Sequence, residues 1–347
     1  MRRLSITLFS LCLASALTAQ TTGSNQSVRL RADNIDEVVS AMTLEEKVHL
    51  VIGCGMSMGS DTKFPGTAGR TYDIPRLGIP SAYLADGPHR LAMAAKREFD
   101  SRTYHATEFP SSTTVAATFN PDAAHKVGRT LGMEVKDYGL DVLLAPGVNL
   151  MRNVLCGRNH EYYSEDPLLT GLCAAADTKG VQSYKGHGTT IKHFAANNQE
   201  DNRNKTNANV NERALREIYL KGFEIAVKES HPGAVMSSYN KVNGKYVNNS
   251  YRLLTQVLRN EWGFDGLVMT DWFATGRKYG DPAHAIASGN DLIMPGSSGT
   301  VDDIVKAVSK GIILEEDIKR SAANVLKGIT SSRIYQGFLR KQRENGI

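Results

Sequence analysis

Short apolar runs alternate with amphipathic stretches along almost the whole chain. The runs occupy residues 81–88, 141–149, 189–195, 233–240, 266–272 and 291–296, with a further candidate at 109–119. Each is short and is bounded by turn-forming residues, so the pattern predicts a series of β-strands.

Helix signals fill the intervals between these runs. Thr43 to Glu46 form a capping box, and Asn120-Pro121 and Asp166-Pro167 are typical of a helix cap followed by the first turn. Apolar positions recur close to every 3.6 residues in 211–229, and a second helical stretch ends at Gly263. The chain is therefore predicted to alternate strand and helix.

This alternation predicts an α/β fold with a parallel sheet that is covered on both faces. Nearly every apolar run ends in polar residues, and in a closed barrel those strand ends meet at one mouth. These polar residues are Asp86, Asn149, Lys192, His193, Tyr239, Asn240 and Asp271. We therefore favour a single-domain (β/α)8 TIM-type barrel, although the runs supply about seven strands where eight are needed.

The first twenty residues differ from the rest of the chain. Arg2 and Arg3 precede an apolar run that ends in small residues, which is typical of a secretory signal peptide. The run is too short to span a bilayer, and no later run is long enough. We expect a signal peptide at 1–20, a barrel domain at 28–335 and a tail at 336–347, in an exported periplasmic or extracellular protein without a membrane anchor.

Charge and cysteine content exclude several other classes. The formal charge of +5 on 347 residues falls when Arg2 and Arg3 are removed, and the chain has no basic tract, so a nucleic-acid partner is not expected. Cys54, Cys156 and Cys173 lack the spacing of a metal site, and buried, inert thiols are expected. No metal-binding motif is present, so neither a metal nor another cofactor is expected.

Two motifs allow more than one interpretation. Residues 55–59 read G-x-S-x-G, but a loop-like stretch follows where the nucleophile elbow of an esterase needs a helix. Asp271 after an apolar strand could cap a helix, or it could serve chemistry beside Trp272. Carboxylates, cations and aromatic rings at one mouth, among them Asp86, Arg158 and Lys192, suit the recognition of sugar hydroxyls and of the apolar face of a pyranose.

With these motifs the sequence resembles glycoside hydrolase family 3. The likeness lies in ordered blocks, which read MTLEEKV, ADGP, GVNLMRNVLCGRNHEYYSEDP, KHFAANNQEDNR, NERALREIYLKGFE, AVMSSYNKVNG, LLTQVLRNEWGFDGLVMTDW and GNDLIMPG. The block KHFAANNQE is similar to the β-glucosidase branch, and the resemblance covers the N-terminal barrel domain of that family. It implies a retaining β-glucosidase that acts on terminal β-glucosyl residues.

The resemblance also implies roles for single residues. Asp271 matches the catalytic nucleophile, and nearby cations are expected to lower the pKa of its carboxyl. Trp272 would flank the scissile bond. The residues that match those holding the sugar in the cleaved subsite are Asp86, Arg158, Lys192, His193 and Tyr239, with Met236 lining it.

One element of the family pattern has no counterpart here. Retaining hydrolysis needs a second carboxyl as acid and base, and in this branch a downstream α/β-sandwich domain supplies it. We expect that domain to be absent after the barrel, and nothing assigns the role to Glu200 or Asp201. Another domain or chain could supply the group. A truncated glycan-binding remnant, half of a split enzyme, and a β-xylosidase or arabinofuranosidase remain alternatives.

Overall fold

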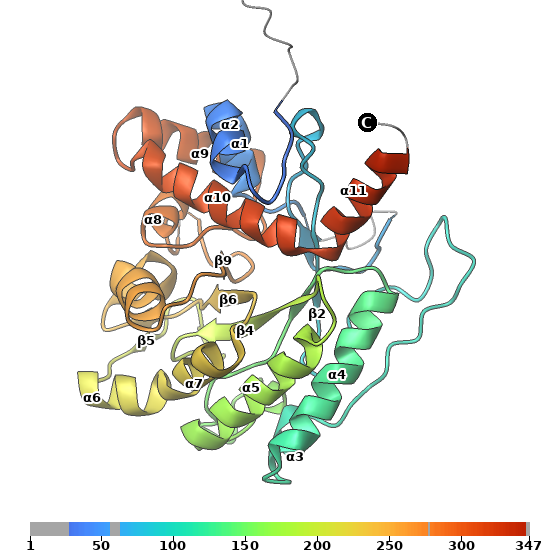
Figure 1. The fold of residues 1–347 in the computed structure, drawn as a ribbon. Coiled ribbons are helices and arrows are strands. Elements are labelled where there is room, and N and C mark those ends of the chain that lie inside the picture. Colours follow the sequence, from blue (N-terminus) through green and yellow to red (C-terminus); the bar gives the residue numbers. More distant parts are fainter. Residues whose placement is uncertain (1–27, 56–62, 277, 345–347) are drawn as a thin grey trace, which may run out of the picture.

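The computed structural model describes residues 28–55, 63–276 and 278–344, and most of its apolar runs form strands at the centre of the molecule, with helices around them (Figure 1). The predicted signal peptide and most of the G-x-S-x-G motif lie outside these residues. The strands of the main sheet are β1 (Gly69–Arg70), β2 (Tyr83–Asp86), β3 (Val142–Leu144), β4 (Gly188–Phe194), β6 (Ala234–Ser237) and β9 (Leu267–Thr270). They pair in the order β1-β2-β3-β4-β6-β9, and every pair is parallel except β1 with β2.

Two very short segments close this sheet into a barrel. Residue 292 bridges β9 at Met269, and residue 293 bridges Ile52 in parallel. Cys54 then bridges Arg70 of β1 in the antiparallel sense. Together with the six strands of the main sheet, the segments 52–54 and 292–293 complete a ring of eight strand positions, which confirms the predicted TIM-type barrel.

Side chains along the strands alternate between the barrel interior and the surrounding helices. Leu84, Leu144 and Met269 share one apolar cluster, whereas their neighbours along the strands belong to two others. This alternation follows from the two-residue period of a β-strand. Asp86 and Asp271 have the same parity as the interior positions, so the fold directs both carboxyl groups to the barrel axis at the mouth.

Helices surround the strands, and the first of them pack against the last (Figure 1). They are α1 (Ile35–Ala41), α2 (Leu44–Leu50), α3 (Ser112–Ala116), α4 (Pro121–Asp137), α5 (Pro167–Gln182), α6 (Glu212–Ala214), α7 (Lys221–Ser230), α8 (Pro282–Ala287), α9 (Ser298–Ser309), α10 (Glu315–Ser331) and α11 (Arg333–Glu344). The π-helices η3 (Leu215–Tyr219) and η5 (Arg252–Glu261) and the 3₁₀ turns η1 (Pro75–Leu77), η2 (Asn159–Glu161) and η4 (Val247–Asn249) complete the set. A small sheet joins β5 (Asn207–Ala208), β7 (Lys241–Val242) and β8 (Lys245–Tyr246).

The strand predicted within 109–119 is wrong, because this segment contains the helix α3. The Ser111 hydroxyl accepts a hydrogen bond from the backbone N–H of Thr114 and so caps the helix. The run of threonine and valine suggested a strand through its β-propensity, but the cap determines the local structure. The two barrel strands that no apolar run predicted are β1 and the segment 52–54, which are too short to show any hydrophobic period.

The last helix is tied to the barrel by a buried carboxylate. Asp141 accepts hydrogen bonds at 2.9 Å from the backbone N–H of Tyr83 and at 2.9 Å from that of Ile334. Burial raises the pKa of Asp141 to about 6. The predicted boundary between barrel and tail at residue 335 falls inside α11, whose Tyr335 is buried in the core.

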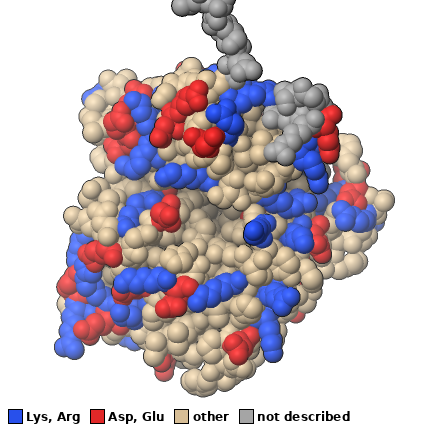
Figure 2. All heavy atoms as spheres, viewed as in Figure 1, with Lys and Arg blue, Asp and Glu red and all other residues tan. Residues whose placement is uncertain are grey.

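The outer surface carries cationic and anionic side chains side by side (Figure 2). Several form ion pairs one helical turn apart, such as Arg213 with Glu217 and Arg216 with Glu212. Exposed pairs of this kind contribute at most about 1 kcal/mol each to stability. Across the described residues, no helix has the length and hydropathy that a bilayer span requires.

The cysteines are only partly as predicted. Cys54, Cys156 and Cys173 are all free thiols, and Cys173 is buried, with burial raising its pKa to about 11. Cys54 and Cys156 are half-buried.

Candidate active site

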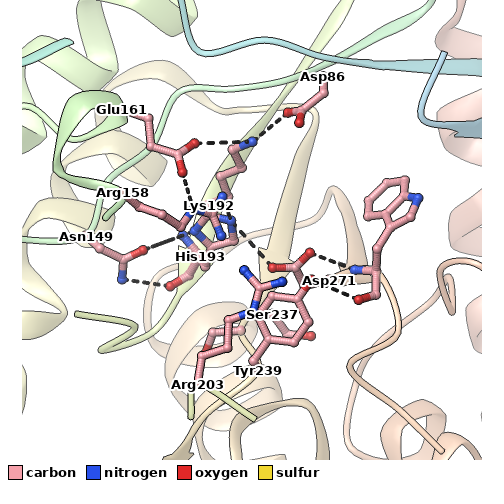
Figure 3. A network of polar contacts seen from close by, with 12 residues as sticks. Asp86, Asn149, Arg158, Glu161, Lys192, His193, Arg203, Ser237, Tyr239 and Asp271 are labelled. Atoms are coloured by element: carbon pink, nitrogen blue, oxygen red, sulfur yellow. Dashed lines mark hydrogen bonds and ion pairs between the residues drawn. The ribbon is translucent and has the colours of Figure 1, made fainter. Parts of the chain in front are cut away.

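The carboxyl ends of the strands bring the predicted polar residues together at the barrel mouth (Figure 3). Asp86 ends β2, Lys192 and His193 lie near the end of β4, and Asp271 directly follows β9. The pairing of β4 with β6 shifts register between Ile191 and Phe194. Adjacent residues of a regular strand face opposite sides, so this irregularity lets Lys192 and His193 both reach the network.

Asp271 presents one bonded and one free carboxylate oxygen. Its Oδ1 accepts a hydrogen bond from the backbone N–H of Trp272 at 2.6 Å, whereas its buried Oδ2 has no hydrogen-bond partner among the described residues. Burial raises the pKa of Asp271 to about 6, although Arg158 and Lys192 oppose this shift. The two cations lower this pKa as expected, but the loss of hydration outweighs their attraction and leaves it above its usual value.

A buried ion-pair network surrounds Lys192. Its Nζ donates a hydrogen bond to Asp86 Oδ1 at 2.7 Å and lies 3.6 Å from Glu161 Oε2. The Lys192 and Glu161 side chains are 3% and 5% exposed, whereas that of Asp86 is 54% exposed. Burial would raise the pKa values of Asp86 and Glu161, but the lysine ammonium lowers both. Two ionised acceptors thus flank one ammonium, and only the Asp86 carboxylate lies open to solvent.

His193 is held as a neutral imidazole. Arg158 Nη2 lies 2.8 Å from His193 Nε2, and because a guanidinium can only donate, Nε2 must be the acceptor. The proton then resides on Nδ1, which lies 3.2 Å from the Tyr162 hydroxyl. Burial and the neighbouring Arg158 charge lower the pKa of His193 well below its usual value. The 3.5 Å approach of Nε2 to Asp271 Oδ2 is therefore not an ion pair.

The backbone beside His193 is fixed by an asparagine amide. Asn149 Oδ1 accepts from the His193 N–H at 2.7 Å, and Asn149 Nδ2 donates to the His193 carbonyl at 2.9 Å. Both contacts are buried, so the strand end after β3 sets the position of the strand end after β4.

Aromatic groups flank the other side of Asp271. The Trp272 indole N–H donates to the carbonyl of Ala68 at 2.9 Å, which fixes the ring at the mouth. The Tyr239 hydroxyl donates to the Trp272 carbonyl at 2.8 Å, and the Arg203 guanidinium lies 4.1 Å from the centre of the Tyr239 ring (Figure 3). The Tyr239 hydroxyl also lies close enough to Asp271 to help lower the pKa of that carboxyl, although the Trp272 carbonyl receives its hydrogen bond.

The structure gathers most of the predicted site residues into one constellation. Asp86, Arg158, Lys192, His193, Tyr239, Trp272 and Asp271 are joined by the contacts above. Met236 differs, because its side chain is buried in the apolar cluster that contains Leu144 and Met269. It pairs in register with Met269 and so faces the barrel interior with the same parity as Asp271, and its role in lining the subsite stays a prediction.

Sequence reasoning missed three members of the network. Glu161 and Arg203 contact the predicted residues directly, and Glu200 lies 4.0 Å from Arg158 and 2.9 Å from Arg203. Glu161 and Arg203 lie in irregular connections within the motifs GRNHE and NNQEDNR. A charge pattern without a period gives no indication of which side chain will be buried, so only the fold identifies them.

A separate cavity of about 440 Å³ lies at the opposite end of the barrel. Its lining includes Asp141, Gly188, Gly233 and Gly266, which stand where the strands begin. None of the residues of the polar network belongs to it. Within the part of the chain that the structure describes, no group of three or more His, Cys, Asp or Glu residues is placed to hold a metal ion.

The chain is similar to known proteins over most of its length. The model of the glycosyl hydrolase family 3 N-terminal domain matches residues 87–327. The thermostable β-glucosidase B of Acetivibrio thermocellus is 42% identical over 302 residues, which are 86% of this chain and 38% of that protein. The exo-α-(1→6)-L-arabinopyranosidase of Bifidobacterium longum is 41% identical over 300 residues, which are 85% of this chain and 37% of that protein.

A solved structure shows the same arrangement of strands and helices. β-Glucosidase 3B of Thermotoga neapolitana in complex with α-D-glucose superposes with a TM-score of 0.82 at 46% identity, covering 88% of this chain and 44% of that one. The chain thus spans less than half the length of these relatives. The family model covers well over half of the chain, and the barrel and its ordered motifs agree with it, so this chain belongs to glycoside hydrolase family 3.

Proposed function

We propose that this chain carries the nucleophile and the sugar subsite of a retaining β-glucosidase that acts on terminal β-D-glucosyl residues. The observation that supports this most directly is the free Oδ2 of Asp271, which is buried between an arginine–histidine pair and an indole. A nucleophilic carboxylate needs one oxygen without a partner, and its other oxygen must be held in place. The backbone N–H of Trp272 donates a hydrogen bond to that other oxygen, Oδ1, and holds it in place.

In the proposed first step, Asp271 Oδ2 attacks the anomeric carbon, and the bond from that carbon to the leaving-group oxygen breaks. The sugar becomes an ester of Asp271, and the leaving group departs with the bonding electrons and takes up a proton. Water then attacks the same carbon and regenerates the carboxylate. Asp86 would accept hydrogen bonds from sugar hydroxyls, Arg158 and Lys192 would donate to sugar oxygens, and Trp272 would pack on the ring face.

The proton donor for the leaving group is proposed to come from a separate domain or chain. Asp86 and Glu161 are poor candidates, because the lysine ammonium lowers their pKa values and keeps both ionised near neutral pH. The relatives are longer than this chain, which leaves room in them for such a group. Loss of general acid–base assistance slows a reaction by about 10²–10⁴. We therefore propose that the chain alone carries out the first step on activated substrates.

A burst experiment tests this function. Mixed with dinitrophenyl β-glucoside, whose leaving group hardly needs protonation, the chain is expected to release close to one equivalent of phenol and then turn over slowly. Mass spectrometry of the quenched protein should show one glucosyl adduct, and azide should speed its removal. If the phenol is released no faster than in buffer and no adduct forms, the chain is not a glucosidase nucleophile domain.

The same experiment distinguishes the alternatives. Full turnover that appears only when a second polypeptide is added indicates half of a split enzyme, and glucose binding without any burst indicates a glycan-binding protein. A relative is named an arabinopyranosidase, so the panel should include aryl xylosides and arabinopyranosides. A larger burst with a pentoside than with the glucoside would revise the substrate class.

The burst rate is expected to fall as the pH drops through about 6. Burial raises the pKa of Asp271 to about 6, and only its ionised form attacks the anomeric carbon. Because the group is an acid, the rate constant should level off above that pH and decrease about tenfold per pH unit well below it. Stopped-flow burst rates from pH 4 to 8 provide the measurement, and a rate that stays constant down to pH 4.5 would contradict the assignment.

Export to the periplasm or exterior also remains a proposal. The basic start at Arg2 and Arg3 and the apolar run that follows support it. Cell fractionation together with N-terminal sequencing of the mature protein tests it, because a retained Met1 would contradict cleavage.

A further inference from the structure

Glu200 is a half-buried carboxylate of the active-site region that the proposed mechanism does not use. It lies in the connection between β4 and β5, and its Oε2 accepts a hydrogen bond from Arg203 Nη1 at 2.9 Å. Its other oxygen, Oε1, is buried, has no hydrogen-bond partner among the described residues and lies 4.0 Å from Arg158 Nη1. One carboxylate therefore stands between two arginines.

Each of these arginines also contacts a residue of the proposed sugar site. Arg158 contacts His193 at 2.8 Å, and His193 lies 3.5 Å from the free oxygen of Asp271. Arg203 lies over the ring of Tyr239, whose hydroxyl donates to the Trp272 carbonyl. Glu200 thus reaches both sides of the nucleophile through intermediaries, without contacting Asp271 in any described interaction.

The two arginines depend on Glu200 to different degrees. Arg158 has a second and closer carboxylate partner, Glu161. For Arg203, the ion pair found among the described residues is the one with Glu200. An arginine without its carboxylate can adopt other rotamers, because the remaining cation–π contact is weak at a partly exposed site.

We propose that Glu200 is a positioning residue, which fixes Arg203 on Tyr239 and so sets the wall of the sugar subsite beside Asp271. This inference rests on the proposed function for its substrate class, a terminal β-glucoside. Glu200 acts mainly through Arg203, and its Oε1 gives Arg158 a second carboxylate neighbour at 4.0 Å.

The test compares Glu200→Gln with Asp201→Asn in the full chain. Gln keeps the shape and one acceptor but removes the charge, whereas Asp201 is an exposed neighbour without a described side-chain contact. Glu200→Gln is expected to weaken glucose binding in calorimetry, and to raise the glucoside concentration for half-maximal burst rate, by about tenfold, the size of one charge-assisted hydrogen bond. Asp201→Asn should stay within twofold of the parent chain.

A double-mutant cycle separates positioning from a general structural effect. If Glu200 acts through Arg203, Glu200→Gln should change glucose affinity less than twofold when Arg203→Met, which removes the cation, is already present. A loss of the same size in both backgrounds would overturn the proposal, as would a single variant that binds like the parent. Equal unfolding free energies of parent and Glu200→Gln would show that the loss is not due to misfolding.

A measurement without sugar keeps this inference distinct from the proposed function. The side-chain Nε–H resonance of Arg203, assigned from its disappearance in Arg203→Lys, should shift and broaden in Glu200→Gln and stay unchanged in Asp201→Asn. If the parent chain neither binds glucose nor gives a burst, the proposed function fails while this readout still decides the positioning role. An Arg203 resonance that is unaffected by Glu200→Gln refutes it.

Discussion

Replacing Asp271 by asparagine is expected to abolish the burst of phenol from dinitrophenyl β-glucoside while making the folded protein more stable. The amide cannot form the ester intermediate, and removal of a nucleophile generally lowers a rate by about 10³-fold or more. Asn Oδ1 can still accept from the Trp272 backbone N–H, and the amide matches the carboxylate in shape. The fold should therefore be retained.

The gain in stability follows from the raised pKa of the Asp271 carboxyl. Its folded value of about 6 exceeds the ordinary value of 3.8, so the folded state binds the proton more tightly than the unfolded state does. Ionisation therefore destabilises the fold increasingly from pH 3.8 upward and fully above pH 6. Two pKa units correspond to at most about 3 kcal/mol at pH 8, and the asparagine variant is free of this penalty.

Denaturant unfolding at pH 8 and at pH 4 measures this difference. The variant should be more stable at pH 8, and the gain should be much smaller at pH 4. Asp265→Asn, at an exposed position close to β9, provides the control and should stay within about 0.5 kcal/mol of the parent. A variant that keeps the burst refutes the nucleophile, and one that is less stable at pH 8 refutes the electrostatic account.

Lys192→Met is expected to destabilise the protein by about 2–3 kcal/mol and to abolish the burst. Methionine fills a similar volume, but Glu161 would remain buried with Arg158 as its remaining ionic partner. Losing one partner of a buried pair costs about 3–5 kcal/mol when the other is left uncompensated, and Arg158 reduces that loss here. Asp86 contributes little to the loss, because it is 54% exposed and can be rehydrated.

Lys47→Met provides a matched comparison. Its side chain is 6% exposed, similar to the 3% of Lys192, but its partner Glu315 is 46% exposed. Glu315 can return to water, so this change should cost about 1 kcal/mol or less. Adding Glu161→Gln to Lys192→Met should recover part of the stability. If both lysine variants unfold at the same denaturant concentration, the buried network is not what stabilises the mouth.

The parts of the site that the sequence predicts are those that follow from strand periodicity. Asp86 and Asp271 stand at strand ends with the same parity as the interior residues, so the barrel model alone brings them together. Glu161, Glu200 and Arg203 lie in irregular connections, where position depends on contacts between segments distant in sequence. The pKa of Asp271 also escaped prediction, because its direction depends on how much burial outweighs the cations.

The fold shows the same division. The strands β2, β3, β4, β6 and β9 and the segment 292–293 were recognised from their apolar runs, whereas β1 and the segment 52–54 are too short to carry a pattern. At 109–119, the hydrogen bond that the Ser111 hydroxyl accepts from the Thr114 backbone N–H favours a helix over the strand preference of threonine and valine. Met236 was assigned to the subsite, and its strand parity turns it to the barrel interior as it does Asp271, so its contact with a sugar stays a prediction.

The pairing of residue 52 with residue 293 also bears on the order in which this chain can fold during synthesis. The segment 52–54 emerges from the ribosome early, yet its partner at residue 293 is synthesised only after nearly all the other strands of the barrel. Until then the unpaired edges of the growing sheet stay open to association with other chains. Late closure of this kind lengthens the time in which a nascent barrel depends on chaperones. The open edges are covered only once the segment 292–293 has been synthesised and has paired.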